Sequence, residues 1–234
     1  MRDGYLQNFG DTYTHPSRRD DGGFLVTQKS KLTSLPVLRY VCADWRGRCP
    51  MLRRRPQFAM QGESMDAEPA RLIIEALKEE KIDLYVTLPE EPTVSLTQAV
   101  QADPYFQCVT VASEDGGVAL TAGAAIAGRR AVFVTGIAGL LKGGLALMHM
   151  GPQYGIPVFI LASYRGDFGD RSGISGSKLQ VFRQVGEPFL QALRIPYQIA
   201  GERRTLKRTI RDAHFMCRTS DMPAALLLTG EVLW

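Results

Sequence analysis

The chain has 234 residues, of which 45% are hydrophobic and 22% charged, a composition that fits one large α/β domain or two small ones. No apolar run reaches the roughly 18 to 20 residues of a membrane-spanning helix, so we expect a soluble protein without a membrane partner. The four cysteines show no Cys-x-x-Cys spacing. This argues against a disulfide framework or a zinc site and favours the cytoplasm.

The net charge of +4 is distributed unevenly along the chain. Residues 1–60 hold 11 Lys and Arg against 5 Asp and Glu, whereas residues 61–234 hold 17 against 19. The later part therefore lacks the basic surface that indicates nucleic-acid binding. Residues 1–62 also lack a sustained hydrophobic period, and we interpret them as a basic, disordered extension. Alternatively, the natural start is Met60 or Met65.

Residues 63–234 alternate between helical and strand-like patterns and are interpreted as one domain. Helices are expected near residues 66–80, 93–102, 114–128, 144–154, 179–193 and 204–218, and strands near 83–88, 105–112, 131–135, 156–162, 196–200 and 224–229. The long apolar strands are typical of strands buried on both faces, as in parallel sheets. This order predicts a three-layer α/β fold whose mainly parallel six-stranded sheet carries helices on both faces.

In such sheets ligands bind beyond the carboxyl ends of the strands. Those ends carry Pro89 with Glu90, Ser113 with Glu114, a glycine-rich stretch over 136–144, and the polar residues 163–165. The glycine-rich stretch has neither P-loop spacing nor a dinucleotide fingerprint. We interpret it as a loop that enters a helix, and it either shapes a ligand site or allows the helix to pack closely.

Glu114 stands between an apolar strand-like run and a helix of Ala, Val, Leu and Gly that we expect to be buried. An acid at a helix start is stabilised by the helix dipole, which is one account of it. The other account is a buried carboxylate kept for hydrogen bonding or proton transfer. Arg165 similarly fits either bidentate binding of an anionic substrate or a surface turn.

The segment 109–128, with Ser-Glu-Asp-Gly-Gly-Val-Ala-Leu-Thr-Ala-Gly-Ala at its centre, resembles the pyrimidine-binding domain of thiamine-diphosphate enzymes. The likeness covers roughly residues 66 to 230, and includes the strand that ends in Pro89, the glycine-rich stretch and the run 156–166. Within the family it resembles the alpha subunits of sulfopyruvate decarboxylase and the matching half of phosphonopyruvate decarboxylase. The resemblance implies the thiamine-diphosphate-binding fold.

The resemblance also implies roles for particular residues. Glu114 would hydrogen-bond the aminopyrimidine ring of the cofactor and activate it, with Pro89, Gly136 and Gly139 beside the cofactor. Ser163 and Arg165 would face the substrate. The implied activity is decarboxylation of a 3-substituted pyruvate such as 3-sulfopyruvate or 3-phosphonopyruvate, a reaction in which the cofactor is the electron sink.

Part of the family pattern is missing from the chain. Gly-Asp-Gly, which with a later asparagine holds the diphosphate and Mg²⁺, is absent, and Asn8 is the one asparagine. The resemblance therefore implies a beta subunit that supplies these groups, a hetero-oligomer, and no metal ligand on this chain. Glu90 and Glu91 stand where the family often has Cys or Ser, and these acids would repel a doubly anionic substrate.

Two other functions remain open. A non-catalytic regulatory or structural subunit of the same fold is the alternative to the decarboxylase subunit. A nucleotide-binding α/β module is the third possibility, and the missing phosphate motifs count against it.

Overall fold

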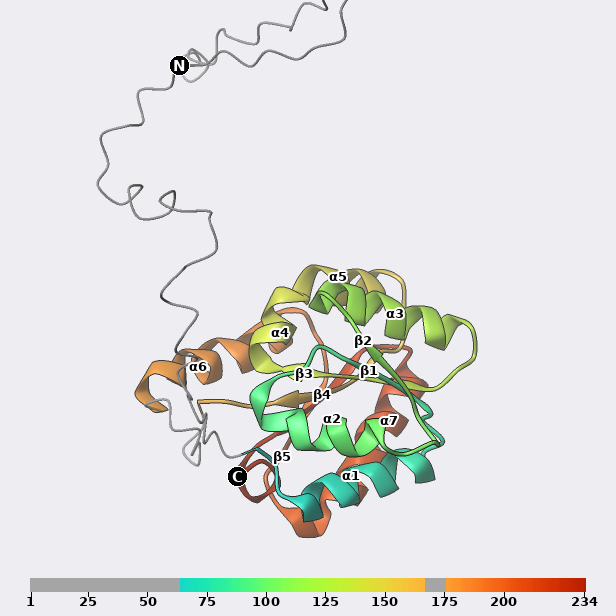
Figure 1. Ribbon diagram of the computed structural model, residues 1–234. Helices are drawn as coiled ribbons and strands as arrows, with labels where there is room; N and C mark the ends of the chain where they lie inside the picture. Colours follow the sequence, from blue (N-terminus) through green and yellow to red (C-terminus); the bar gives the residue numbers. More distant parts are fainter. Residues whose placement is uncertain (1–63, 167–175) are drawn as a thin grey trace, which may run out of the picture. The chain divides into compact units, whose positions relative to one another are not determined.

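The computed structural model describes residues 64–166 and 176–234 (Figure 1). Its strands are β1 (Leu84–Thr87), β2 (Gln107–Thr110), β3 (Ala131–Gly136), β4 (Phe159–Ser163), β5 (Tyr197–Ala200) and β6 (Ala224–Leu228). Its α-helices are α1 (Ala67–Glu79), α2 (Val94–Gln101), α3 (Glu114–Ile126), α4 (Ile137–Lys142), α5 (Gly144–Met148), α6 (Gly176–Ala192) and α7 (Leu206–Ser220). The extension expected over residues 1–62 lies outside the described residues.

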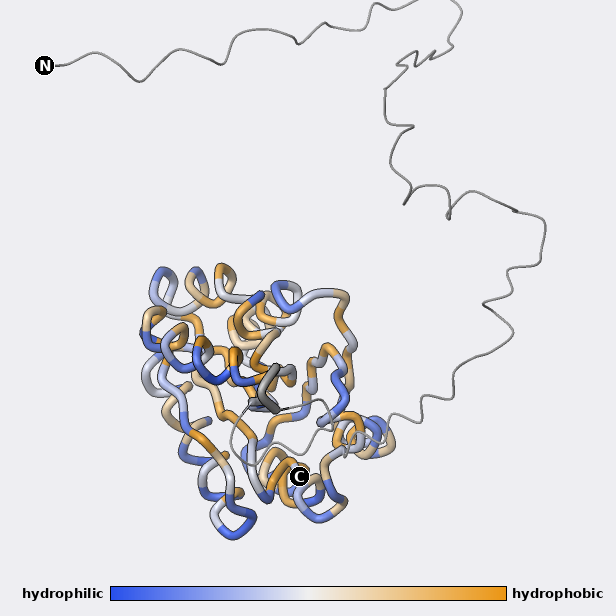
Figure 2. Tube along the Cα trace, turned by 90° about the vertical axis from the view of Figure 1, so that its left-hand side faces the viewer, coloured by the Kyte–Doolittle hydropathy of each residue, from blue (hydrophilic) through white to orange (hydrophobic). Residues whose placement is uncertain are grey.

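The strands form one six-stranded sheet in the order β2-β1-β3-β4-β6-β5, and every pair is parallel. Helices α1, α2 and α7 cover one face, and α3, α4, α5 and α6 cover the other (Figure 1). The predicted three-layer α/β fold is confirmed. Figure 2 shows hydrophobic stretches along the inner segments and hydrophilic residues at the outer turns. None of the helices within the described ranges is long and apolar enough to cross a membrane.

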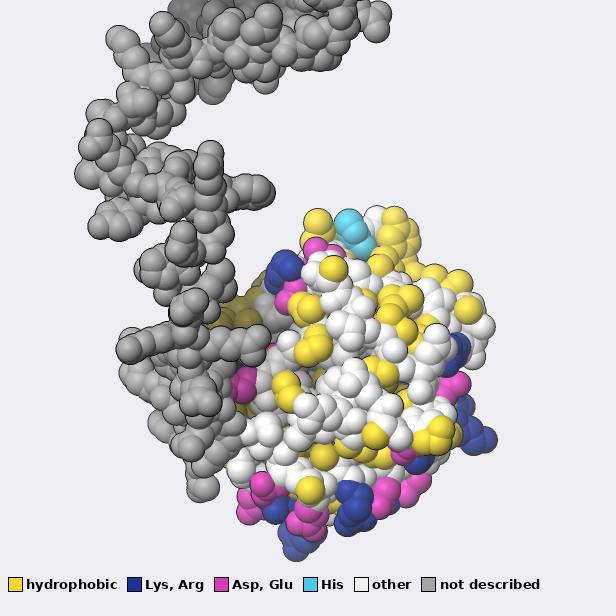
Figure 3. Space-filling view, in the orientation of Figure 1, with side chains coloured by type: hydrophobic (Ala, Val, Ile, Leu, Met, Phe, Trp, Pro, Cys, Tyr) yellow, Lys and Arg dark blue, Asp and Glu magenta, His cyan; other side chains and the backbone are white. Residues whose placement is uncertain are grey.

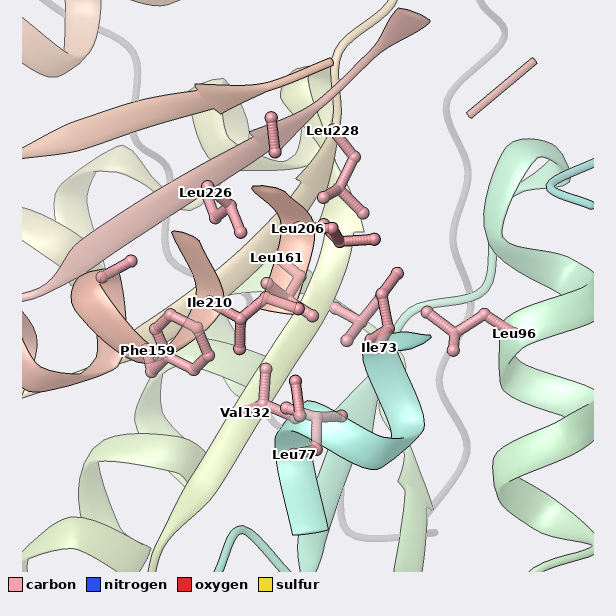
Figure 4. Packing of buried hydrophobic residues seen from close by; sticks show 14 of the residues in the cluster. Ile73, Leu77, Leu96, Val132, Phe159, Leu161, Leu206, Ile210, Leu226 and Leu228 are labelled. Carbon is pink, nitrogen blue, oxygen red and sulfur yellow. The ribbon is translucent and has the colours of Figure 1, made fainter. Parts of the chain in front are cut away.

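Two hydrophobic cores fill the spaces between the sheet and the helix layers. In the first, Ile73 and Leu77 of α1 and Ile210 of α7 pack against Leu161 of β4 (Figure 4). Side chains alternate between the faces of a strand, so successive residues of β3 belong to different cores. Val132 and Val134 lie in the first core and Phe133 lies in the second. The same alternation directs position 136 towards the first face and position 135 towards the second.

Helix α3 is buried on one side only, which corrects the expectation that it is buried throughout. Its inner side contacts β3 so closely that a Cβ on Gly117 would lie 2.2 Å from the ring of Phe133. On its outer side, Leu120 is 39% exposed and Ile126 is 71% exposed. A helix in an outer layer presents only one stripe to the sheet, so the remaining apolar residues of α3 face outward within this chain.

The glycine-rich stretch is helical, which corrects its interpretation as a loop. After Gly136, helix α4 begins at once and α5 follows it. Glycine costs a helix about 1 kcal/mol relative to alanine, which is why the sequence favours a loop. Here the glycines are contact points instead, because a Cβ on Gly144 would lie 2.2 Å from the ring of Phe189. Close packing therefore accounts for glycine within these short helices.

Candidate active site

Glu114 is the first residue of α3, but it is not the helix cap. Ser113 is the N-cap, and its Oγ accepts a hydrogen bond from the backbone N–H of Gly116 at 3.2 Å. The Glu114 side chain is 13% exposed, and its Oε2 accepts a hydrogen bond from Lys142 Nζ at 2.7 Å. Capping is thus provided by the neighbouring serine, and the Glu114 carboxylate faces α4. The hydrogen bond to Glu114, together with the negative charge of that carboxylate, raises the pKa of Lys142.

Gly139 brings the backbone of α4 against Glu114. A Cβ at position 139 would lie 2.9 Å from Glu114 Cγ and 2.2 Å from Thr135 Oγ1. Real Cβ atoms do not approach other atoms so closely, so any larger residue would displace the glutamate or the helix. The structure therefore brings together Glu114 and Gly139, two of the residues expected at one site.

Glu90 occupies the space beside Gly136. It lies between β1 and a short 3-10 helix over Glu91–Thr93, and a Cβ at position 136 would lie 1.9 Å from Glu90 Oε2. Burial raises the pKa of the Glu90 carboxyl to about 7; the positive charge of Arg165 opposes this rise, and the negative charge of Glu91 adds to it. A carboxyl with such a pKa exists in both protonation states near neutral pH.

Ser163 and Arg165 lie at the end of the neighbouring strand. Ser163 pairs with Gly136 in the parallel register of β3 and β4, and it is fully buried. Arg165 Nη2 donates a hydrogen bond to Glu91 Oε2 at 3.0 Å, and both side chains are largely buried. Pro89, also expected at the site, is exposed just beyond β1.

Helix α4 connects two groups of side chains. Gly136, with its neighbour Glu90, precedes the helix, and Gly139, with its neighbour Glu114, lies three residues further on. Three residues of an α-helix span about 4.5 Å. The carboxylates of Glu90 and Glu114 therefore flank the same turn of backbone, at the carboxyl edge where parallel sheets place their ligands.

The sequence did not assign a role to Glu90, nor did it predict the ion pair of Glu114 with Lys142. A signal for Glu90 is present in the sequence, because this acid lies three residues after the end of the fully buried strand β1. Among the residues that the structure describes, no group of three or more His, Cys, Asp and Glu is arranged to hold a metal ion. The chemistry that the site offers is hydrogen bonding and proton exchange by carboxyl groups, together with the Ser163 hydroxyl and the Arg165 guanidinium.

Glu90→Gln is expected to raise the free energy of unfolding at pH 8 by about 1 to 3 kcal/mol, and by less than about 0.5 kcal/mol at pH 4.5. The carboxyl ionises near 4.5 in the unfolded chain and near 7 in the folded one. Between these values the folded state keeps a proton that the unfolded state releases, so the wild-type protein loses stability as pH rises through this window. Urea unfolding of the wild type and the variant at both pH values measures the difference in free energy of unfolding. A difference of equal size at pH 8 and pH 4.5 would contradict the burial of Glu90.

Comparison with known proteins gives similarities in sequence and in structure. Residues 68–169 match the family model described as the thiamine pyrophosphate enzyme N-terminal TPP binding domain. The chain is 26% identical over 164 residues to the sulfopyruvate decarboxylase subunit alpha of Methanothermobacter thermautotrophicus, covering 70% of this chain and 97% of that protein. It is 23% identical over 156 residues to the subunit of the same name from Methanococcus maripaludis, covering 67% of this chain and 91% of that protein.

Among solved structures, the chain is similar to a 2-oxoglutarate:ferredoxin oxidoreductase from Magnetococcus marinus, with a TM-score of 0.54 at 14% identity. The match covers 73% of this chain and 30% of that one, and at this identity it supports the fold alone. The sequence similarities cover the part of the chain that contains Glu114. They confirm the resemblance to thiamine-diphosphate enzymes, and in particular to sulfopyruvate decarboxylase alpha subunits.

Proposed function

We propose that this chain is the alpha subunit of a heteromeric thiamine-diphosphate-dependent decarboxylase that acts on a 3-substituted pyruvate of the 3-sulfopyruvate or 3-phosphonopyruvate type. The observation that carries the proposal is the position of Glu114, whose carboxylate lies at the start of α3 against the backbone of α4 at Gly139. The match of residues 68–169 to a thiamine pyrophosphate-binding domain supports it. The names of the two relatives support the decarboxylase activity and the division into subunits.

In this proposal Glu114 forms a hydrogen bond to the aminopyrimidine ring of the cofactor. The residues fit that ring, because the carboxylate is largely buried and its described partner is Lys142, a side chain 57% exposed. Ion pairs with an exposed partner contribute at most about 1 kcal/mol, so a cofactor can replace Lys142 at little cost. Bound thiamine diphosphate supplies the electron sink for loss of carbon dioxide. Gly136, Gly139 and Pro89 are assigned to the cofactor side, and Ser163 and Arg165 to the substrate side.

The partner of this chain is proposed to be a beta subunit that carries the diphosphate-binding domain and Mg²⁺. The layer that carries Glu114 exposes apolar side chains on α3, on α5 and at the end of the π-helix over His149–Gln153: Leu120, Ile126, Leu145, Met148 and Tyr154. Figure 3 shows hydrophobic side chains over this region, whereas charged side chains gather along the edge formed by α1 and α7. Several large apolar side chains exposed on the layer that carries Glu114 support a protein interface on this side of the sheet.

Leu145→Glu is expected to abolish copurification with the beta subunit, whereas Phe215→Glu is expected to leave it intact. The two side chains are matched, because Leu145 is 65% exposed on α5 and Phe215 is 64% exposed on α7, in the opposite layer. A charge buried at an interface without a partner costs several kcal/mol, whereas the same charge on a free surface costs little. Affinity purification of each variant with the beta subunit measures the effect. Equal retention of the two variants would contradict an interface over α5.

Reconstitution tests the proposed function. The chain is coexpressed with a candidate beta subunit that carries a Gly-Asp-Gly domain, and carbon dioxide release from 3-sulfopyruvate and 3-phosphonopyruvate is measured with thiamine diphosphate and Mg²⁺. We expect release by the complex and none by either subunit alone. A stable complex without release from any 2-oxo acid would favour the non-catalytic subunit instead. Failure to assemble with any such partner would refute the proposal.

A further inference from the structure

Three buried polar atoms at the carboxyl ends of β1 and β4 have no hydrogen-bond partner. Within the described part of the chain, the buried side-chain atoms that lack one are Glu90 Oε1, Ser163 Oγ, Arg165 Nε and Trp234 Nε1. Buried polar groups are nearly always hydrogen-bonded, because leaving one unpaired destabilises the folded protein. Three of them in one place indicate that a ligand completes their hydrogen bonds.

The geometry of the sheet places these three residues together. Gly136 and Ser163 are paired across β3 and β4, and paired residues of parallel strands point to the same face about 4.8 Å apart. The carboxyl group of Glu90 occupies the position that a side chain on Gly136 would take, so it lies next to the hydroxyl of Ser163. Arg165 follows two residues after Ser163, and its hydrogen bond to Glu91 holds it beside Glu90.

The types of these groups identify the ligand as an anion. The Ser163 hydroxyl and the Arg165 Nε–H are donors, and an anionic oxygen is their natural acceptor. An ionised Glu90 would repel such an oxygen, but a protonated Glu90 would be a third donor to it. A carboxylic acid in a buried site can be kept neutral and used as a donor in this way.

The charges that shift the pKa of Glu90 are those of Arg165 and Glu91, and one charged group on α4 and one on α6 have partners of their own. Glu91 is paired with Arg165, and on α4 Lys142 is paired with Glu114. Glu187 of α6 accepts hydrogen bonds from the hydroxyls of Tyr164 and Tyr197. An anion that enters beside Glu90 therefore adds a negative charge next to a carboxyl that burial already disfavours in its ionised form.

We propose that Glu90 takes up one proton from solvent when an anionic substrate binds, and that protonated Glu90, Ser163 and Arg165 together hold an anionic oxygen of that substrate. The identity of the substrate as a 2-oxo acid rests on the proposed function, whereas the anion site rests on the residues of this chain. Glu90 thereby acquires a binding role, in place of the purely repulsive effect that its charge suggests in the sequence.

Titration calorimetry with 3-sulfopyruvate, without thiamine diphosphate so that no reaction occurs, measures the proton directly. The full-length chain, alone and with its beta subunit, is titrated in buffers of different ionisation enthalpy, and the slope gives the protons taken up per ligand. Because the Glu90 carboxyl has a pKa of about 7 in the protein without ligand, proton uptake per bound ligand is expected to be about 0.9 at pH 8 and about 0.1 at pH 6. The affinity is expected to fall nearly tenfold per pH unit above 7.

Two variants separate the role of Glu90 from that of its neighbours. Glu90→Gln, which imitates the protonated acid, is expected to bind with an affinity independent of pH and without proton uptake. Ser163→Ala is expected to bind 3-sulfopyruvate at least about fivefold more weakly and to retain the proton uptake. The wild-type pH dependence tests the inference even if a variant does not fold.

Binding without proton uptake, uptake that persists in Glu90→Gln, or no binding to either preparation would each overturn the inference. Its failure is distinguishable from failure of the proposed function. Carbon dioxide release without proton uptake would support the function and refute the anion site. Proton-coupled binding with no release of carbon dioxide after addition of thiamine diphosphate and Mg²⁺ would support the anion site and refute the proposed function.

Discussion

Glu114→Gln is expected to lower the rate of carbon dioxide release by the assembled enzyme at least about 100-fold, the lower range for loss of a positioned proton-transfer group. The amide keeps the size of the side chain that contacts Gly139, but it does not exchange a proton as a carboxyl does. The rate constant of a reconstituted complex measures the loss. Calorimetric titration with thiamine diphosphate shows in addition whether cofactor binding is weakened.

Asp115→Asn is the matched control for this experiment. Asp115 is the next residue in the first turn of α3, and it is exposed. Each substitution removes one negative charge from the same helix start, where a charge contributes roughly 0.3 to 1 kcal/mol through the helix dipole. The two variants should therefore unfold at similar temperatures, while only the change at Glu114 lowers activity. Equal activities would contradict the role of Glu114 and favour a non-catalytic subunit.

Gly117→Ala is expected to destabilise the chain by about 2 kcal/mol or more, because the added methyl group would lie 2.2 Å from the ring of Phe133. Phe133 is fully buried in β3, so the ring cannot move out of the way. Overpacking of this kind typically costs about 1 to 3 kcal/mol. The expected fall in melting temperature is several degrees. Because α3 must move away from the sheet, the position of Glu114 should change and activity should fall as well.

Gly123→Ala in the same helix is expected to have the opposite effect on the isolated chain. Apart from its chain neighbours and the backbone of its own helix, no atom lies within 4 Å of a Cβ at position 123. Alanine favours a helix over glycine by about 1 kcal/mol, so this variant should be slightly more stable. Differential scanning calorimetry of both variants measures the contrast. Similar melting temperatures for the two would contradict the close contact between α3 and β3.

The succession of strands and helices could be predicted because the strands are continuous apolar runs and the helices are periodic. The expected strand at 131–135 is observed as Ala131–Gly136, and the expected helix from residue 114 begins there. The glycine-rich stretch was misinterpreted because glycine is a poor helix former in isolation. Its contacts with Phe189 and Glu114, which account for glycine there, join residues far apart in the sequence.

The candidate site could be predicted as a location more readily than as a set of interactions. Parallel topology alone places Glu114, Gly136 and Ser163 at one edge of the sheet. The burial of the Glu90 carboxyl beside Gly136 depends on the register between β1, β3 and β4, which no local pattern reveals. The exposure of Leu120 and Ile126 likewise could not be predicted. A helix of small apolar residues has the same sequence pattern whether it lies in a core or at an interface.

The measurement that tests the central claim most directly is calorimetric titration of thiamine diphosphate, with Mg²⁺, into the chain alone, into the complex with its beta subunit, and into the Glu114→Gln complex. If Glu114 is one half of an active site, the chain alone gives no saturable binding, the complex binds one cofactor for each copy of this chain, and the Glu114→Gln complex binds more weakly. Saturable binding to the chain alone, or equal binding to the wild-type and Glu114→Gln complexes, would contradict it.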